Sequence, residues 1–126
     1  MNDLNAIVAW AGILAGVVMG IVLGLRFHEP DWLGGYNAWP RRLLRLGHIS
    51  FFGIALLNLA FAVTVQRLGW HPATRWAGLG LAAAEVLMPA VCFLAAWRPG
   101  FRRAFFVPVS CVLIGVVGLL LGRATS

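Results

Sequence analysis

Four apolar runs constrain this chain more than any other feature of its sequence. They cover residues 4–25, 43–65, 76–97 and 104–121, and most of the charged residues lie between them. A helix rises about 1.5 Å per residue, so about 20 residues cross a hydrocarbon core of about 30 Å. Backbone polar groups inside lipid must be satisfied within their own segment, which favours helices. We therefore predict an all-α, polytopic integral membrane protein: one domain over residues 1–126, formed by a four-transmembrane-helix bundle with short loops.

The composition excludes several other classes of protein. Hydrophobic residues make up 61% of the 126 residues and charged residues only 11%, whereas an ordinary soluble domain carries about 25% charged residues. A disordered chain, a disulfide-stapled secreted module and an ordinary cytosolic enzyme are therefore excluded. We expect no separate soluble catalytic or nucleic-acid-binding domain.

The distribution of arginine predicts the orientation of the chain. All ten basic residues are arginine. Seven lie in or beside the loops at 26–42 and 98–103: Arg26, Arg41, Arg42, Arg45, Arg98, Arg102 and Arg103. Because basic loops are retained in the cytoplasm, we expect both loops there and both termini outside, in the bacterial inner membrane. Arginines beside membrane spans attract anionic headgroups, so we expect the lipid bilayer, and not nucleic acid, as their partner.

The first loop, residues 26–42, mixes aromatic side chains with charges and glycines. Trp and Tyr favour the headgroup level of a bilayer. We expect this loop to lie along the membrane surface as an interfacial anchor; a docking surface or a cap over a site is the alternative. The residues assigned to lipid headgroup contact or docking are Arg41, Arg42, Arg45, Trp32 and Trp39.

Glycines recur at every fourth position of the first run, at Gly12, Gly16, Gly20 and Gly24. A stripe of small residues with this spacing lets another helix backbone approach closely. It predicts tight helix packing, either against a helix of this chain or against another subunit.

Glu85 is the only charged residue of the third run. At 100° per residue it shares a helix face with Gly78 and Ala82, so we expect it to point into the bundle and not toward lipid. An intramembrane carboxylate is energetically expensive and by default marks a functional site. The alternative is a purely structural hydrogen bond between helices.

His48 and Asn58, both in the second run, are the other intramembrane polar candidates. His48 and Glu85 differ in depth by about 10 Å, a gap that a water or tilted side chains can bridge. The three residues would then form a polar track through half the bilayer. A lone intramembrane histidine more often makes an interhelical hydrogen bond.

A haem is a further alternative, because a four-helix bundle can hold one between facing helices. Its candidate ligands are His48 and Met88, and haem b is the cofactor that this pair would hold. No clustered His, Cys and carboxylate set supports a metal site, and no catalytic motif is recognisable. We therefore assign neither a metal ligand nor a catalytic residue.

Prolines interrupt the third and fourth runs at Pro89 and Pro108. Proline removes a helical hydrogen bond, so we predict a kink at each position.

Two functional hypotheses follow. The first is an accessory or structural subunit of a larger membrane complex, of the energy-transducing or redox kind, without catalytic activity of its own. Four short helices bury little surface alone, so we expect other membrane subunits or self-association. The second is a small homo-oligomeric, proton-coupled transporter or channel that uses Glu85. A membrane haem-b protein that uses His48 is the third and weakest alternative.

Overall fold

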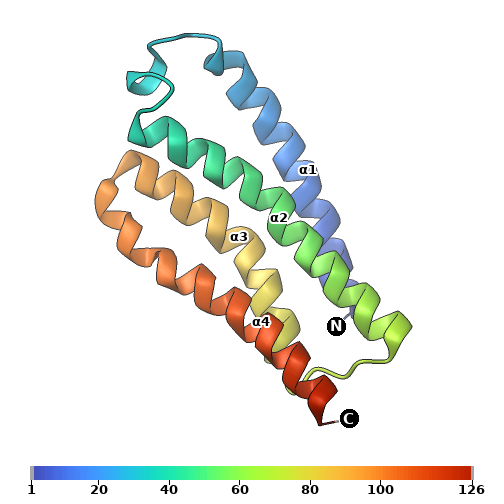
Figure 1. The fold of residues 1–126 in the computed structure, drawn as a ribbon. Coiled ribbons are helices and arrows are strands. Elements are labelled where there is room, and N and C mark those ends of the chain that lie inside the picture. Colours follow the sequence, from blue (N-terminus) through green and yellow to red (C-terminus); the bar gives the residue numbers. More distant parts are fainter. Residues whose placement is uncertain (1, 126) are drawn as a thin grey trace.

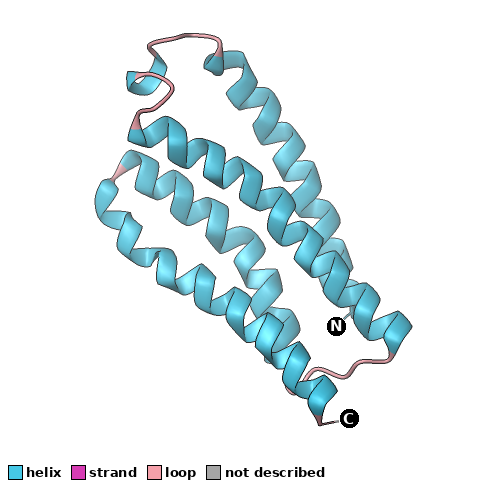
Figure 2. Cartoon of the chain, in the orientation of Figure 1, coloured by secondary structure: helices cyan, strands magenta, loops and turns pink. Residues whose placement is uncertain are grey.

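The structure is a computed structural model that describes residues 2–125 and holds four long helices. These are α1 (Asn2–Phe27), α2 (Trp39–Leu68), α3 (Trp76–Trp97) and α4 (Phe106–Ala124), with two short 3₁₀ helices, η1 (Trp32–Gly34) and η2 (Pro99–Phe105). The helices run up and down, and both termini lie at the same end (Figure 1). Figure 2 shows only helices and loops in the described part of the chain. The prediction of an all-α chain is confirmed, and all four helices are long and apolar enough to cross a membrane.

The helices extend beyond the apolar runs at most of their ends. α2 begins at Trp39 and not at residue 43, because Pro40 fits the first turn of a helix, where its missing N–H costs nothing. α2 ends at Leu68, and Gly69 follows with a φ of 65°, the left-handed conformation that commonly terminates a helix. α3 has the predicted bounds.

The two prolines have different positions in their helices. The expected interior kink at Pro108 is not required, because α4 begins at Phe106 and Pro108 lies in its first turn. The first four N–H groups of a helix have no acceptor within the helix, so a proline there breaks no bond. Pro89 does lie inside α3. Since it has no N–H, it leaves the backbone carbonyl of Glu85, four residues earlier, without its usual helical partner.

The helices form a packed group of three with a fourth at its side. α1 packs against α2 and α3, and α4 packs mainly against α3. A small buried cluster joins the last three helices: Phe61, Ala77 and Leu81, with Val65, Val112 and Leu119 packed against it. The outward faces carry large apolar side chains, such as Ile7 at 66% and Leu14 at 65% exposed. An exposed apolar surface of this extent is typical of a site of contact with a membrane or with another protein.

The first loop is held together by Arg41. This side chain is only 2% exposed, and its guanidinium donates hydrogen bonds to the carbonyls of Phe27 (2.8 Å), Glu29 (3.1 Å) and Pro30 (3.2 Å). It also lies 4.8 Å from the centre of the Phe27 ring. We expected Arg41 to face lipid headgroups, but its side chain is buried. The loop folds back and surrounds the guanidinium with its own carbonyls.

The other residues assigned to headgroup contact or docking lie in different surroundings. The Trp39 indole donates to the carbonyl of Ala95 at 3.1 Å and so joins α2 to α3. Trp32 lies in η1 with its ring 5.5 Å from that of Phe27. Arg42 is exposed and Arg45 is half-buried, so these two arginines keep access to the surface.

Candidate functional site

Glycines of α1 allow close approach to the side chains of α2 and α3. A Cβ at Gly16 would lie 2.8 Å from the Phe52 ring, and one at Gly20 would lie 2.8 Å from Nε2 of His48. A Cβ at Gly12 would overlap the Glu85 carboxyl group. Three of the four glycines thus lie against side chains of this same chain, whereas Gly24 has nothing within 4 Å of the corresponding position.

Glu85 lies near the middle of α3 and is only 3% exposed. It points into the packed helices, against α1 at Gly12. Neither of its carboxylate oxygens has a hydrogen-bond partner within residues 2–125. A buried polar group without a partner loses its interactions with water and gains nothing in return. Glu85 is therefore the least satisfied charged group of the described chain.

Two asparagines join α1, α2 and α3 beside this carboxylate. Asn5 and Asn58 are both 0% exposed. Asn5 Nδ2 donates to Oδ1 of Asn58 at 2.7 Å and to the carbonyl of Gly78 at 2.9 Å. Asn58 Nδ2 in turn donates to the carbonyls of Ile54 (3.1 Å) and Leu81 (2.9 Å). The sequence gives little indication of the role of Asn5, because its only signal is a polar residue near the start of an apolar run.

Asn58 and Glu85 lie next to each other. Leu81, whose carbonyl accepts from Asn58, is one turn before Glu85 on α3, and Asn58 is the polar side chain beside the carboxyl group. Both N–H bonds of the Asn58 amide are directed at backbone carbonyls. The Asn58 amide therefore lies close enough to interact with the Glu85 carboxylate, but its N–H groups are committed to these carbonyls and leave the carboxylate oxygens without a well-formed hydrogen bond.

His48 lies apart from this cluster. Its Nε2 is 3.1 Å from the carbonyl of Gly16, and its ring meets Phe52 edge-on with the centres 5.4 Å apart. It contacts α1 at Gly16 and Gly20, one to two turns from Gly12 and Glu85. The structure thus brings Asn58 and Glu85 together, adds Asn5, and places His48 in an interhelical contact of its own.

The packing around His48 does not fit a haem. Nε2 already faces a backbone carbonyl of α1. At Gly47, where a porphyrin would need room, a Cβ would lie 2.6 Å from the Phe93 ring and 3.0 Å from Cβ of Cys92. A haem ligated by His48 and Met88 would have to displace these contacts, so we derive no chemistry from one.

A groove of about 430 Å³ lies between α1 and α3, with Glu85 in its wall. The residues that line it are Val8, Ala11, Gly12, Ala15, Phe51, Glu85, Val86, Pro89, Ala90 and Phe93. Small side chains form most of its α1 side, and Glu85 is its only charged residue. Val86, which is 67% exposed, connects the groove to the outer surface of the bundle.

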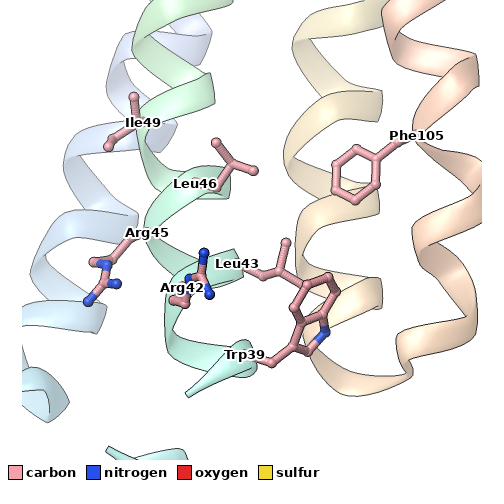
Figure 3. A pocket seen from close by; sticks show the side chains of 7 residues that line it. All are labelled: Trp39, Arg42, Leu43, Arg45, Leu46, Ile49 and Phe105. Atoms are coloured by element: carbon pink, nitrogen blue, oxygen red, sulfur yellow. The ribbon is translucent and has the colours of Figure 1, made fainter. Parts of the chain in front are cut away.

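A second groove, of about 580 Å³, lies at the start of α2 (Figure 3). Trp39, Leu43 and Leu46 form one wall, and Phe105 faces them from the end of η2, just before α4. Arg42, Arg45 and Ile49 complete the lining.

No group of three or more His, Cys, Asp or Glu side chains that could hold a metal ion occurs in the described part of the chain. No protein-family model, curated protein or solved structure matches the chain. The chemistry that the geometry offers is that of one buried carboxylate, two bonded amides and an apolar groove.

Proposed function

We propose that this chain is an integral protein of the bacterial inner membrane that serves as an accessory subunit of a larger membrane complex, of the energy-transducing or redox kind. In this proposal both termini lie outside, and the loops at 26–42 and 98–103 lie in the cytoplasm, as the arginine distribution predicts. One observation carries the proposal: the two carboxylate oxygens of Glu85 are buried without a partner in the wall of a groove.

The burial of Glu85 is energetically costly. An unpaired charged side chain near the middle of a bilayer costs at least about 2.5 kcal/mol. Within residues 2–125 no donor compensates that cost. A group from outside the chain can reach the carboxylate through the groove between α1 and α3. The small side chains of α1 there permit close approach of a partner helix.

A different protein suits this position better than a second copy of the chain. The arginines of the chain lie in its loops or close to the ends of its helices, so a second copy brings no cation to the depth of Glu85. Asn5 and Asn58 are fully buried, and their amide N–H groups are already engaged, so neither can donate to Glu85; only Oδ1 of Asn5, an acceptor, has no partner within residues 2–125. We therefore propose a partner helix that carries a basic or strongly hydrogen-bonding side chain at the level of Glu85.

Purification of the tagged chain from its native membrane in a mild detergent tests the proposal. We expect a different membrane protein to co-purify in a fixed ratio, and the isosteric variant Glu85→Gln to lose most of it. Glu29→Gln is the matched control, because Glu29 is exposed in the first loop. A homo-oligomer without other subunits, or equal recovery of the partner with Glu85→Gln, would refute the proposal.

A second candidate function, a small homo-oligomeric, proton-coupled transporter, is favoured by the contiguous polar groups Asn5, Asn58 and Glu85. Asn5 lies near the terminal end of the bundle and Glu85 near the middle of α3, so the three span part of the bundle's length. Proteoliposomes with an internal pH dye distinguish this function from the first. A proton flux in the wild type that Glu85→Gln abolishes would favour transport over the accessory role.

A further inference from the structure

The groove at the start of α2 changes character along its length. Its lining runs on α2 from Trp39 to Ile49, a rise of about 15 Å, which is about half the hydrocarbon thickness of a bilayer. Arg42 and Arg45 lie toward the end of the bundle, whereas Leu46 and Ile49 lie deeper along the helix (Figure 3). The groove thus has a charged end near the surface and an apolar part deeper in the bundle, which matches the headgroup and acyl chain of one phospholipid in one leaflet.

The floor of the groove is rigid at its polar end. The Trp39 indole is fixed by its hydrogen bond to the carbonyl of Ala95. Arg45 donates to the carbonyl of Tyr36 at 3.0 Å, and its guanidinium lies 3.9 Å from the centre of the Tyr36 ring. A guanidinium held in this way presents its other N–H groups without a large loss of side-chain entropy.

The positive charge at this end is not neutralised by the described chain. The side chain of Arg42 is exposed, and the structure gives neither Arg42 nor Arg45 an ion pair with a carboxylate of residues 2–125. Two further arginines, Arg102 and Arg103, precede Phe105 in η2. The end of the groove therefore attracts an anion, and phosphate oxygens suit the planar donors of arginine.

We propose that this groove binds one anionic phospholipid of the phosphatidylglycerol kind. The phosphate lies between Arg42 and Arg45, and one acyl chain follows Leu46, Ile49 and Phe105. This site is independent of Glu85, which lies in the other groove.

Native mass spectrometry of the purified chain tests the proposal. The protein is supplied in detergent with equal amounts of phosphatidylglycerol and phosphatidylcholine that have identical acyl chains. We expect one phosphatidylglycerol to be retained in preference to phosphatidylcholine. Each arginine near a membrane surface contributes about 1 kcal/mol to the attraction of anionic lipid, so Arg42→Gln lowers the preference about fivefold.

Two further variants separate charge from shape. Leu46→Trp fills the apolar part of the groove and leaves the charge intact, so we expect it to release the lipid. Arg67→Gln removes a charge at the other end of α2 and leaves binding unchanged. Excess inorganic phosphate does not displace the lipid, because the acyl chain contributes to its binding. Equal retention of the two lipids, no effect of Arg42→Gln or Leu46→Trp, or displacement by inorganic phosphate would overturn the proposal.

Discussion

At the scale of single residues, Glu85 fits between α1 and α3 only because residue 12 is a glycine, whose missing side chain leaves room for the carboxyl group. Helical spacing was enough to predict that Glu85 points into the bundle, because the small residues of α3 share its face. The sequence could not predict that the Glu85 carboxylate lacks a hydrogen-bond partner, because this depends on which backbone carbonyls accept the N–H groups of Asn58. That choice is fixed only when α2 and α3 are in register.

Gly12→Ala should weaken the packing of α1 against α3. The added Cβ would overlap the Glu85 carboxyl group. Overpacking of this kind lowers the free energy of unfolding by about 1–3 kcal/mol. Gly24→Ala is the matched control, because nothing lies within 4 Å of that Cβ. Thermal unfolding in detergent should show a lower midpoint for Gly12→Ala only; equal midpoints for both variants would contradict the packing described here.

The role of Asn5 cannot be predicted from the sequence, because polar residues are common near the ends of apolar runs. Its role appears only when α1 lies beside α2 and α3, which places its amide against Asn58 and Gly78. Hydropathy identifies the runs but does not state which positions of different helices share a level.

Asn5→Ala and Asn58→Ala should each destabilise the bundle by about 1 kcal/mol, the scale of interhelical hydrogen bonds in membranes. The two substitutions remove the same bond, so the double variant should lose less than the sum of the single losses. Unfolding free energies in mixed micelles measure this coupling. Strict additivity would show that the Asn5–Asn58 bond contributes nothing to stability.

At the scale of elements, the apolar runs predict the helix interiors and not their ends. α2 begins at Trp39, four residues before the apolar run. Aromatic and basic residues can form the first turn of a helix although they do not make it hydrophobic. The first loop is likewise set by Arg41, which the sequence does not distinguish from its neighbour Arg42. Their difference arises from the fold of the loop, which gives Arg41 three carbonyl acceptors.

Arg41→Gln should loosen the first loop while Arg42→Gln leaves it intact. The loss of the guanidinium removes the hydrogen bonds to Phe27, Glu29 and Pro30, and charged donors of this kind contribute about 1.5–3 kcal/mol each in buried sites. Hydrogen–deuterium exchange over residues 28–38 should become faster in Arg41→Gln alone. The same protection in both variants would mean that Arg41 does not hold the loop.

At the scale of the whole molecule, four apolar runs were sufficient to predict four helices, which the structure confirms. They were not sufficient to predict that α4 packs mainly against α3, because hydropathy is similar in all four. Nor does hydropathy predict the groove at Glu85, where α1 and α3 meet through small side chains and remain open at Val86. We propose that a partner helix occupies this opening.

Photo-cross-linking from the mouth of the groove tests this claim most directly. A benzophenone amino acid at position 86 lies at the groove, whereas the same group at Leu113 lies on the exposed face of α4. In native membranes, we predict a cross-link from position 86 to a different membrane protein, which Glu85→Gln weakens, and no such product from position 113. Cross-links from position 86 only to lipid or to a second copy of the chain would contradict the account.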